Sequence, residues 1–153
     1  MPKPRRPPRY YLVAGVDLRH ELNRLRALPG FAGGPLAAAE PQLKVRRAGA
    51  RPNRLGFAVP SEFRLSVTAY PGIRPGDALE TLLHELVHLH VGRSREARAW
   101  HGRAFKRTLG RAMAEAYGVE GPPPRTVLHG AYADAIERRR LAGGAQLQLR
   151  LAA

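Results

Sequence analysis

The chain of 153 residues contains no cysteine. This absence excludes disulfide bonds, thiolate metal ligands and a cysteine nucleophile, so any bound transition metal must be held by histidine, aspartate or glutamate. No apolar run approaches the roughly 18 residues that a membrane-spanning helix needs, and the sequence opens on no secretory leader. We therefore expect a cytoplasmic protein with no membrane partner.

Acidic residues are scarce. Asp and Glu number 12 against 26 Lys and Arg, which gives a formal net charge of +14 and a pI of about 11.5. A field of this sign attracts polyanions, among which nucleic acid is the usual partner. Aromatic residues make up only 7% of the chain, too few for a base-stacking platform. The charge thus favours DNA contact and association with the nucleoid; a basic surface that is merely solvated is the alternative.

Proline and glycine divide the chain into three parts. Residues 1–9 form a basic, proline-rich tail that we expect to be disordered. Residues 10–120 form the folded domain, and residues 121–153 form a C-terminal extension of unknown role. Hydrophobic residues at 44% suffice for one core, and the order of the elements predicts an α+β fold with a small, mainly antiparallel sheet packed against helices. We expect helices at 17–28, 77–91, 102–117 and 132–140, strands at 43–47, 55–59 and 63–68, a turn at 143–144 and an alternating segment at 146–151.

The helix expected at 77–91 carries the main chemical signal, an H-E-x-x-H motif formed by His84, Glu85 and His88. Residues four apart lie on one helix face, so both imidazoles can reach one zinc ion. Glu85 lies one residue further round, where its carboxylate can accept a proton from water on the metal and pass it to a leaving amine. Asp77 is the expected N-cap, with Glu80 completing a capping box.

The same helix has an apolar face, so we expect its polar face to remain available to a ligand. A pair of structural, buried histidines is the alternative, and the amphipathic pattern argues against it. The residues of the apolar face are Leu79, Leu82, Leu83, Leu86 and Leu89.

A catalytic zinc needs a third protein ligand and an open fourth position. The metzincin pattern is excluded because Val91 and Ser94 stand where it requires glycine and histidine. Two candidates remain, His101 at the start of the next helix and, less favoured, Glu115 inside that helix. His90 lies roughly 140° round the helix from the pair, so we expect it to be packed rather than ligating. His20 and His129 are expected on the surface.

The motif, the twelve-residue gap and the element His101-Gly102-x-x-Phe105 together resemble the SprT-like zinc metalloprotease domain family, the Spartan-related proteases. The resemblance covers residues 16–117. A softer upstream likeness is carried by Leu22-Asn23, Phe31, Leu36, Leu55-Gly56, Arg64-Leu65-Ser66 and Glu80-Thr81-Leu82-Leu83. The chain would be a minimal form, because many bacterial members carry a four-cysteine zinc ribbon that a chain without cysteine cannot build.

The resemblance implies a zincin-like fold whose catalytic domain occupies residues 10–120. It implies zinc as cofactor with His84, His88 and His101 as ligands, and Glu85 as general acid and base. The activity implied is cleavage of protein or peptide substrates, including proteins bound or crosslinked to DNA.

Basic clusters are the candidate DNA contacts. One group follows the zinc motif and comprises Arg93, Arg95, Arg98, Arg103, Lys106, Arg107 and Arg111; the tail and Arg138-Arg139-Arg140 are the others. The segment 63–68 is the expected sheet edge to which an extended substrate would add.

Two other functions stay open. One is a non-proteolytic nucleic-acid-binding protein with a structural zinc site, and the other is non-peptide hydrolysis on the same metal. Nothing in the sequence indicates an oligomeric state.

Overall fold

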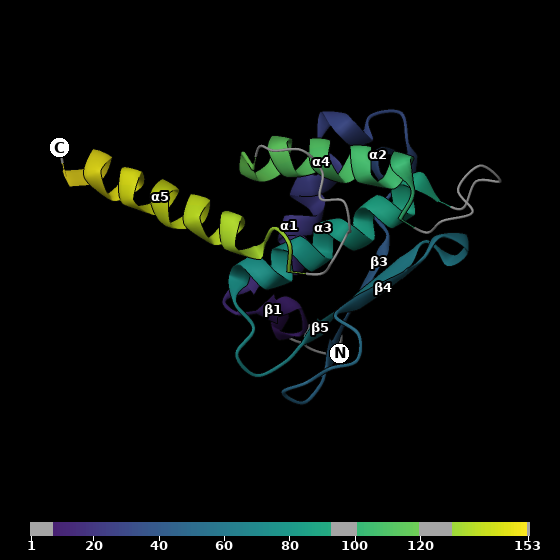
Figure 1. Ribbon diagram of the computed structural model, residues 1–153, viewed down its shortest axis with the longest axis horizontal. Helices are drawn as coiled ribbons and strands as arrows, with labels where there is room; N and C mark the ends of the chain where they lie inside the picture. Colours follow the sequence, from purple (N-terminus) through teal and green to yellow (C-terminus); the bar gives the residue numbers. More distant parts are fainter. Residues whose placement is uncertain (1–7, 93–100, 120–129, 153) are drawn as a thin grey trace, which may run out of the picture.

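The computed structural model describes residues 8–92, 101–119 and 130–152. In these segments small β-sheets combine with five helices, as expected for the α+β class (Figure 1). The helices are α1 (Leu18–Arg26), α2 (Pro35–Ala38), α3 (Pro75–Val91), α4 (Arg103–Tyr117) and α5 (Ala133–Ala152). Short 3-10 turns lie at Pro8–Tyr11, Pro29–Phe31 and Pro60–Glu62. None of the described helices combines the length and the hydrophobicity that crossing a bilayer requires.

The main sheet has three strands, β3 (Gln42–Arg47), β4 (Gly56–Val59) and β5 (Arg64–Ala69), in the order β3-β5-β4. β5 runs antiparallel to β4 but parallel to β3. The expectation of a mainly antiparallel sheet is therefore wrong for this sheet. Side chains alternate in the same way in both arrangements, so the sequence pattern could not distinguish them. A second, two-stranded sheet pairs β1 (Leu12–Val13) with β2 (Val16–Asp17).

The strand order also corrects the expected sheet edge. β5 lies between its two neighbours, and its residues from Leu65 to Ala69 are all buried. The segment 63–68 therefore cannot accept an added strand, because its hydrogen-bonding groups already pair with β3 and β4. β4 is an edge strand instead, since β5 is its only partner among the described strands.

α3 is the centre of the molecule. It contacts β4 and β5 of the main sheet and all four other helices (Figure 1). Every residue from Ala78 to Leu89 is buried. The expected polar face is consequently not open to bulk solvent: His84, Glu85 and His88 are only 2–3% exposed. Polar groups buried to this degree have to find partners inside the protein.

The start of α3 differs from the expected capping box. The helix begins at Pro75, with Arg74 as the N-cap residue. Asp77 occupies the third helical position and accepts a hydrogen bond from the backbone N–H of Arg74 at 3.0 Å. Proline fits the first helical turn because its missing N–H needs no partner there. This proline moves the start of the helix upstream of Asp77.

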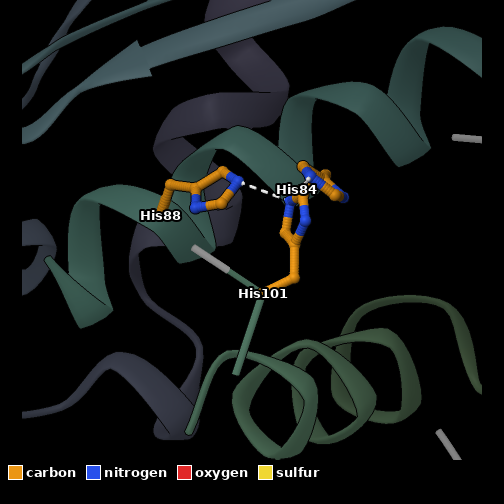
Figure 2. Close-up of side chains that lie close together, drawn as sticks. All are labelled: His84, His88 and His101. Carbon is orange, nitrogen blue, oxygen red and sulfur yellow. Dashed lines mark hydrogen bonds between the residues drawn. The ribbon is translucent and has the colours of Figure 1, made fainter. Parts of the chain in front are cut away.

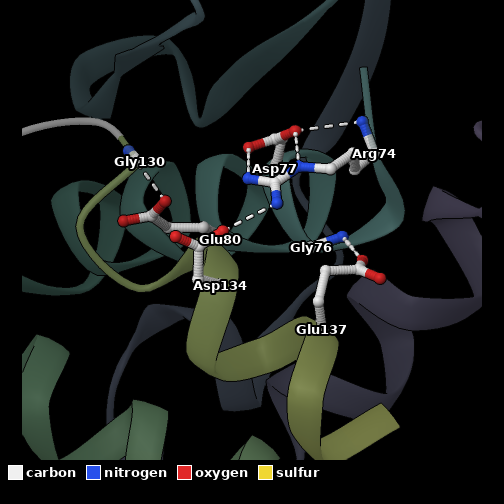
Figure 3. Close-up of polar contacts among 7 residues, drawn as sticks. All are labelled: Arg74, Gly76, Asp77, Glu80, Gly130, Asp134 and Glu137. Atoms are coloured by element: carbon white, nitrogen blue, oxygen red, sulfur yellow. Dashed lines mark hydrogen bonds and ion pairs between the residues drawn. The ribbon is translucent and has the colours of Figure 1, made fainter. Parts of the chain in front are cut away.

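Glu80, expected in the capping box, binds the C-terminal extension instead (Figure 3). Its buried carboxylate accepts backbone hydrogen bonds from Gly130 at 2.8 Å and Tyr132 at 2.9 Å. Nearby, Arg74 pairs with Asp134 at 2.7 Å, and Glu137 accepts a hydrogen bond from the backbone N–H of Gly76. These contacts attach α5 to the first half of α3.

Gly76 lets the two helices approach closely. A Cβ atom at this position would lie 2.5 Å from the carbonyl oxygen of Ala133. Ile136 of α5 is fully buried in the core. The first turns of the extension are therefore part of the folded domain.

The rest of α5 also differs from what the sequence predicted. The helix continues through Gly143 and Gly144, where we expected a turn, and through 146–151, where we expected an alternating segment. Glycine costs a helix about 1 kcal/mol relative to alanine, which is not enough to end it by itself. The C-terminal half of α5 extends away from the other helices (Figure 1). The basic tail falls mostly outside the described residues.

We expect Glu80→Ala to lower the free energy of unfolding by about 2 kcal/mol, because the change leaves two backbone N–H groups without their acceptor. Chemical denaturation followed by circular dichroism measures this loss. Asp134→Ala is the control, since its ion pair is exposed to solvent and we expect little change. Equal stability of the Glu80→Ala and unmodified proteins would contradict the role given to Glu80.

Candidate metal centre

Three imidazoles meet between α3 and the start of α4 (Figure 2). The Nε2 atom of His101 lies 3.1 Å from Nε2 of His84 and 3.1 Å from Nε2 of His88. Within the described part of the chain, these are the residues whose ligand atoms group as a metal site would require, all within 4.8 Å of one another. The expected pair on one helix face and the expected third histidine are thus brought together.

The convergence of these nitrogens has a chemical consequence. An imidazole nitrogen carries either a proton or a lone pair in the ring plane, so one Nε2 cannot donate to one neighbour while accepting from another. A cation at the centre of the three would accept all three lone pairs at once. Ligands about 2.0–2.1 Å from a tetrahedral zinc ion lie about 3.3 Å apart, close to the separations found here. The residues present therefore fit a metal ion.

Burial keeps His101 ready to act as a ligand. Desolvation, together with the nearby charge of Lys106, lowers the pKa of His101 below its ordinary value. The neutral imidazole, which is the form that binds a metal, is thereby favoured at neutral pH.

Phe105 holds the three rings in place. Its side chain is 1% exposed, and its ring centroid lies 4.9 Å from His84, 4.3 Å from His88 and 4.9 Å from His101. α4 begins at Arg103, with Gly102 as its N-cap residue, so Phe105 lies in the first turn and faces α3. The ring restricts the orientation of all three imidazoles, a role that the sequence spacing alone did not reveal.

Glu85 is the only acidic side chain that lines the cleft of the three histidines among the described residues. The cleft has a volume of about 690 Å³. Burial raises the pKa of Glu85 to about 8. A neighbouring cation would favour its ionised form and lower that pKa again. A carboxylate in this setting can exchange a proton near neutral pH.

The absence of a side chain at Gly56, the first residue of β4, leaves space for the side chain of Glu85. A Cβ atom at position 56 would lie 3.2 Å from Cγ of Glu85, 2.8 Å from Cγ2 of Thr81 and 2.7 Å from the carbonyl oxygen of Ser66. Only glycine lets β4 pack this closely on α3. All of β4 consequently lines the cleft. The sequence predicted this strand, at 55–59, but its pattern did not indicate which element the strand packs against.

The other candidate ligands have different roles. Glu115 accepts a hydrogen bond from the backbone N–H of Gly30 at 2.9 Å and is not part of the histidine group. His90 packs against Phe31 with a centroid separation of 5.1 Å, as expected for a packed histidine. His20 is exposed on α1, also as expected, and His129 lies outside the described residues.

The basic residues of α4 form a stripe. Arg103, Arg107 and Arg111 are exposed and spaced four apart along α4, so they lie along one face of the helix. Lys106 is half-buried beside them. The other three members of this group, Arg93, Arg95 and Arg98, lie outside the described residues. Arg138, Arg139 and Arg140 are exposed on α5.

We expect His101→Ala to lower the metal content of the purified protein severalfold, because two imidazoles bind a metal more weakly than three. Elemental analysis measures the content, and a chelator should lower the melting temperature of the unmodified protein more than that of the variant. His20→Ala removes an exposed histidine and serves as the control. Equal metal content in His101→Ala and the control would exclude His101 as a ligand.

Comparisons with family models, with curated proteins and with solved structures gave no match for this chain. Its function is therefore inferred from the chemistry and geometry of the site. The defining features of that site are three converging imidazoles, a buried carboxylate beside them, and an edge strand along the same cleft.

Proposed function

We propose that this chain is a zinc-dependent endopeptidase of the SprT-like class. The observation that carries the proposal is the approach of His101 Nε2 to 3.1 Å from the Nε2 atoms of both His84 and His88, next to the buried Glu85. Three histidine ligands leave a tetrahedral ion with one open position, which is typical of catalytic rather than structural zinc sites.

The donor set supports zinc. Three imidazoles without a thiolate are well suited to zinc, and the absence of further acidic ligands among the described residues disfavours magnesium and calcium. Bound at this site, zinc supplies Lewis acidity for attack on a carbonyl group. His84, His88 and His101 hold the ion, and Phe105 keeps their rings aligned.

Glu85 carries the proton in this mechanism. Its carboxylate accepts a proton from the attacking water and then delivers that proton to the nitrogen of the leaving amine. Burial favours the protonated state that forms between these two steps. The same carboxyl group thus serves first as base and then as acid.

β4 is the strand that supports binding of an extended substrate. Its free edge offers backbone N–H and C=O groups, and its residues line the cleft together with the three histidines. A polypeptide can add to such an edge as a further strand, which would place its backbone beside Glu85. A protein or peptide substrate fits this geometry because the pairing uses the backbone.

We expect Glu85→Gln to retain the metal but to abolish cleavage of an unfolded protein substrate such as casein, because glutamine cannot take up the proton. A loss of about a hundredfold or more is expected for removal of a general base. Gel electrophoresis of the substrate and elemental analysis of the enzyme are the two measurements.

Glu115→Gln provides the matched control, since it makes the same chemical change outside the metal site. It should leave cleavage unchanged. Cleavage by Glu85→Gln at the rate of the unmodified chain would exclude this role for Glu85.

A second candidate function is nucleic-acid binding, which the net charge of +14 and the stripe of Arg103, Arg107 and Arg111 on α4 favour. It is compatible with the first if the substrates are proteins bound or crosslinked to DNA. Nucleic-acid binding would be the function in place of peptidase activity if the metal is structural and the chain cleaves no substrate.

We expect the affinity for duplex DNA to fall steeply with salt, because binding to phosphates releases counterions. Replacing Arg103 and Arg107 together by glutamine should reduce the slope of log affinity against log salt by about 0.9 for each phosphate that is no longer bound. Fluorescence anisotropy across a salt series measures this slope. Undetectable binding, or binding that does not depend on salt, would exclude DNA as a partner.

A further inference from the structure

A second cleft adjoins the metal centre. It has a volume of about 400 Å³ and lies where β3 ends and the chain returns toward β4. We call it the arginine cleft, because Arg46, Arg47 and Arg54 line it together with Asn53 and Thr68. No acidic residue lines it among the described residues.

The three arginines are exposed and have no carboxylate partner among the described residues. The few carboxylates that form ion pairs do so with arginines elsewhere on the protein, namely Arg19, Arg24, Arg64, Arg74 and Arg111. Three arginines without a carboxylate partner line one hollow, and their charge favours an anion there.

The arginine cleft lies beside the metal cleft. Asn53 and Arg54 line both, and β4 begins two residues after Arg54. A polypeptide that pairs with the edge of β4 and runs beyond Gly56 therefore comes next to Asn53 and Arg54, which line the arginine cleft. A side chain of that polypeptide can enter while its backbone stays in the metal cleft.

We propose that the arginine cleft is a specificity subsite that binds an acidic side chain, aspartate or glutamate, of a polypeptide bound along β4. The inference rests on the proposed peptidase function and names the kind of sequence that the same site selects. Guanidinium groups match the planar carboxylate and can bind it with two parallel hydrogen bonds.

A peptide fits this place better than a nucleic acid does. The sheet edge beside the cleft pairs with peptide backbone, which polynucleotides lack. Nucleic acid is held by a row of cations that follows its phosphates, and such a row lies on α4 rather than in this hollow. The arginine cleft therefore affects which peptide binds, and Glu85 performs the chemistry.

The test uses two fluorescent, unstructured peptides that differ only in carrying glutamate or glutamine at the same positions. Zinc-loaded Glu85→Gln protein binds them without cleavage, so anisotropy gives the affinity. We expect the glutamate peptide to bind about fivefold more tightly, as for a partly exposed ion pair. Adding Arg54→Gln or Arg46→Gln should abolish most of this preference.

Arg51→Gln is the matched control. It removes the same charge from the same loop, but Arg51 is exposed and does not line the cleft. The preference should survive this change. Equal affinity for the two peptides would overturn the proposal, and so would an equal loss in the Arg51→Gln and Arg54→Gln variants, because the preference would then reflect net charge alone.

Two further measurements separate this inference from others. If Arg54→Gln weakens binding of a single-stranded oligonucleotide more than binding of the glutamate peptide, the cleft serves nucleic acid and the proposal is wrong. Cleavage by the chain with Glu85 intact is measured with the same peptides. A binding preference without any cleavage would support the subsite and overturn the peptidase function. Cleavage without a binding preference would support the peptidase function and overturn the subsite.

Discussion

The burial of α3 is the constraint on which the rest of the structure depends. A helix that contacts the sheet and every other described helix contributes more residues to the hydrophobic core than any other element, yet it also carries two histidines and a glutamate at 2–3% exposure. Unsatisfied polar groups are costly in such a position, so the fold has to supply partners for them. The imidazole of His101 comes from the residues just before α4, and the cleft along β4 gives the Glu85 carboxylate its access. The same helix therefore supplies both core residues and site residues, and we expect substitutions in α3 to affect both stability and the site.

Much of this site could be predicted from sequence because its determinants are local. His84 and His88 share a helix face by the spacing of the α-helix alone, and His101 follows at the start of the next helix. The roles of Phe105, Gly56 and β4 depend on which elements lie side by side. The sequence pattern of 63–68 is the same for a central and an edge strand, so the edge was placed wrongly. Pro75 likewise shifted the helix start away from Asp77, which then binds the backbone of Arg74.

The C-terminal extension shows how tertiary contacts override local signals. Gly143 and Gly144 predicted a turn, but the helix that begins at Ala133 continues beyond them. Its first turns are held by Ile136 in the core and by Glu80, whose hydrogen bonds join residues about fifty positions apart in sequence. Glu80 was itself expected to cap its own helix. The anchor of α5 and the metal ligands lie on the same helix, so the extension supports the helix that carries the site.

The basic side chains behind the net charge of +14 lie in separate groups on the protein. Most acidic side chains already have partners. Several form ion pairs with Arg19, Arg24, Arg64 or Arg74. Glu80 and Glu137 accept backbone hydrogen bonds, and Glu85 lies beside the histidines. The other arginines are not spread evenly over the described surface. One set lines a hollow beside the metal cleft, Arg103 and Arg107 lie on one face of α4, and Arg138, Arg139 and Arg140 lie on α5. A uniform basic coat would attract any polyanion equally. Two separate sets of arginines can instead bind different anions, with a carboxylate in the hollow and phosphates along the stripe.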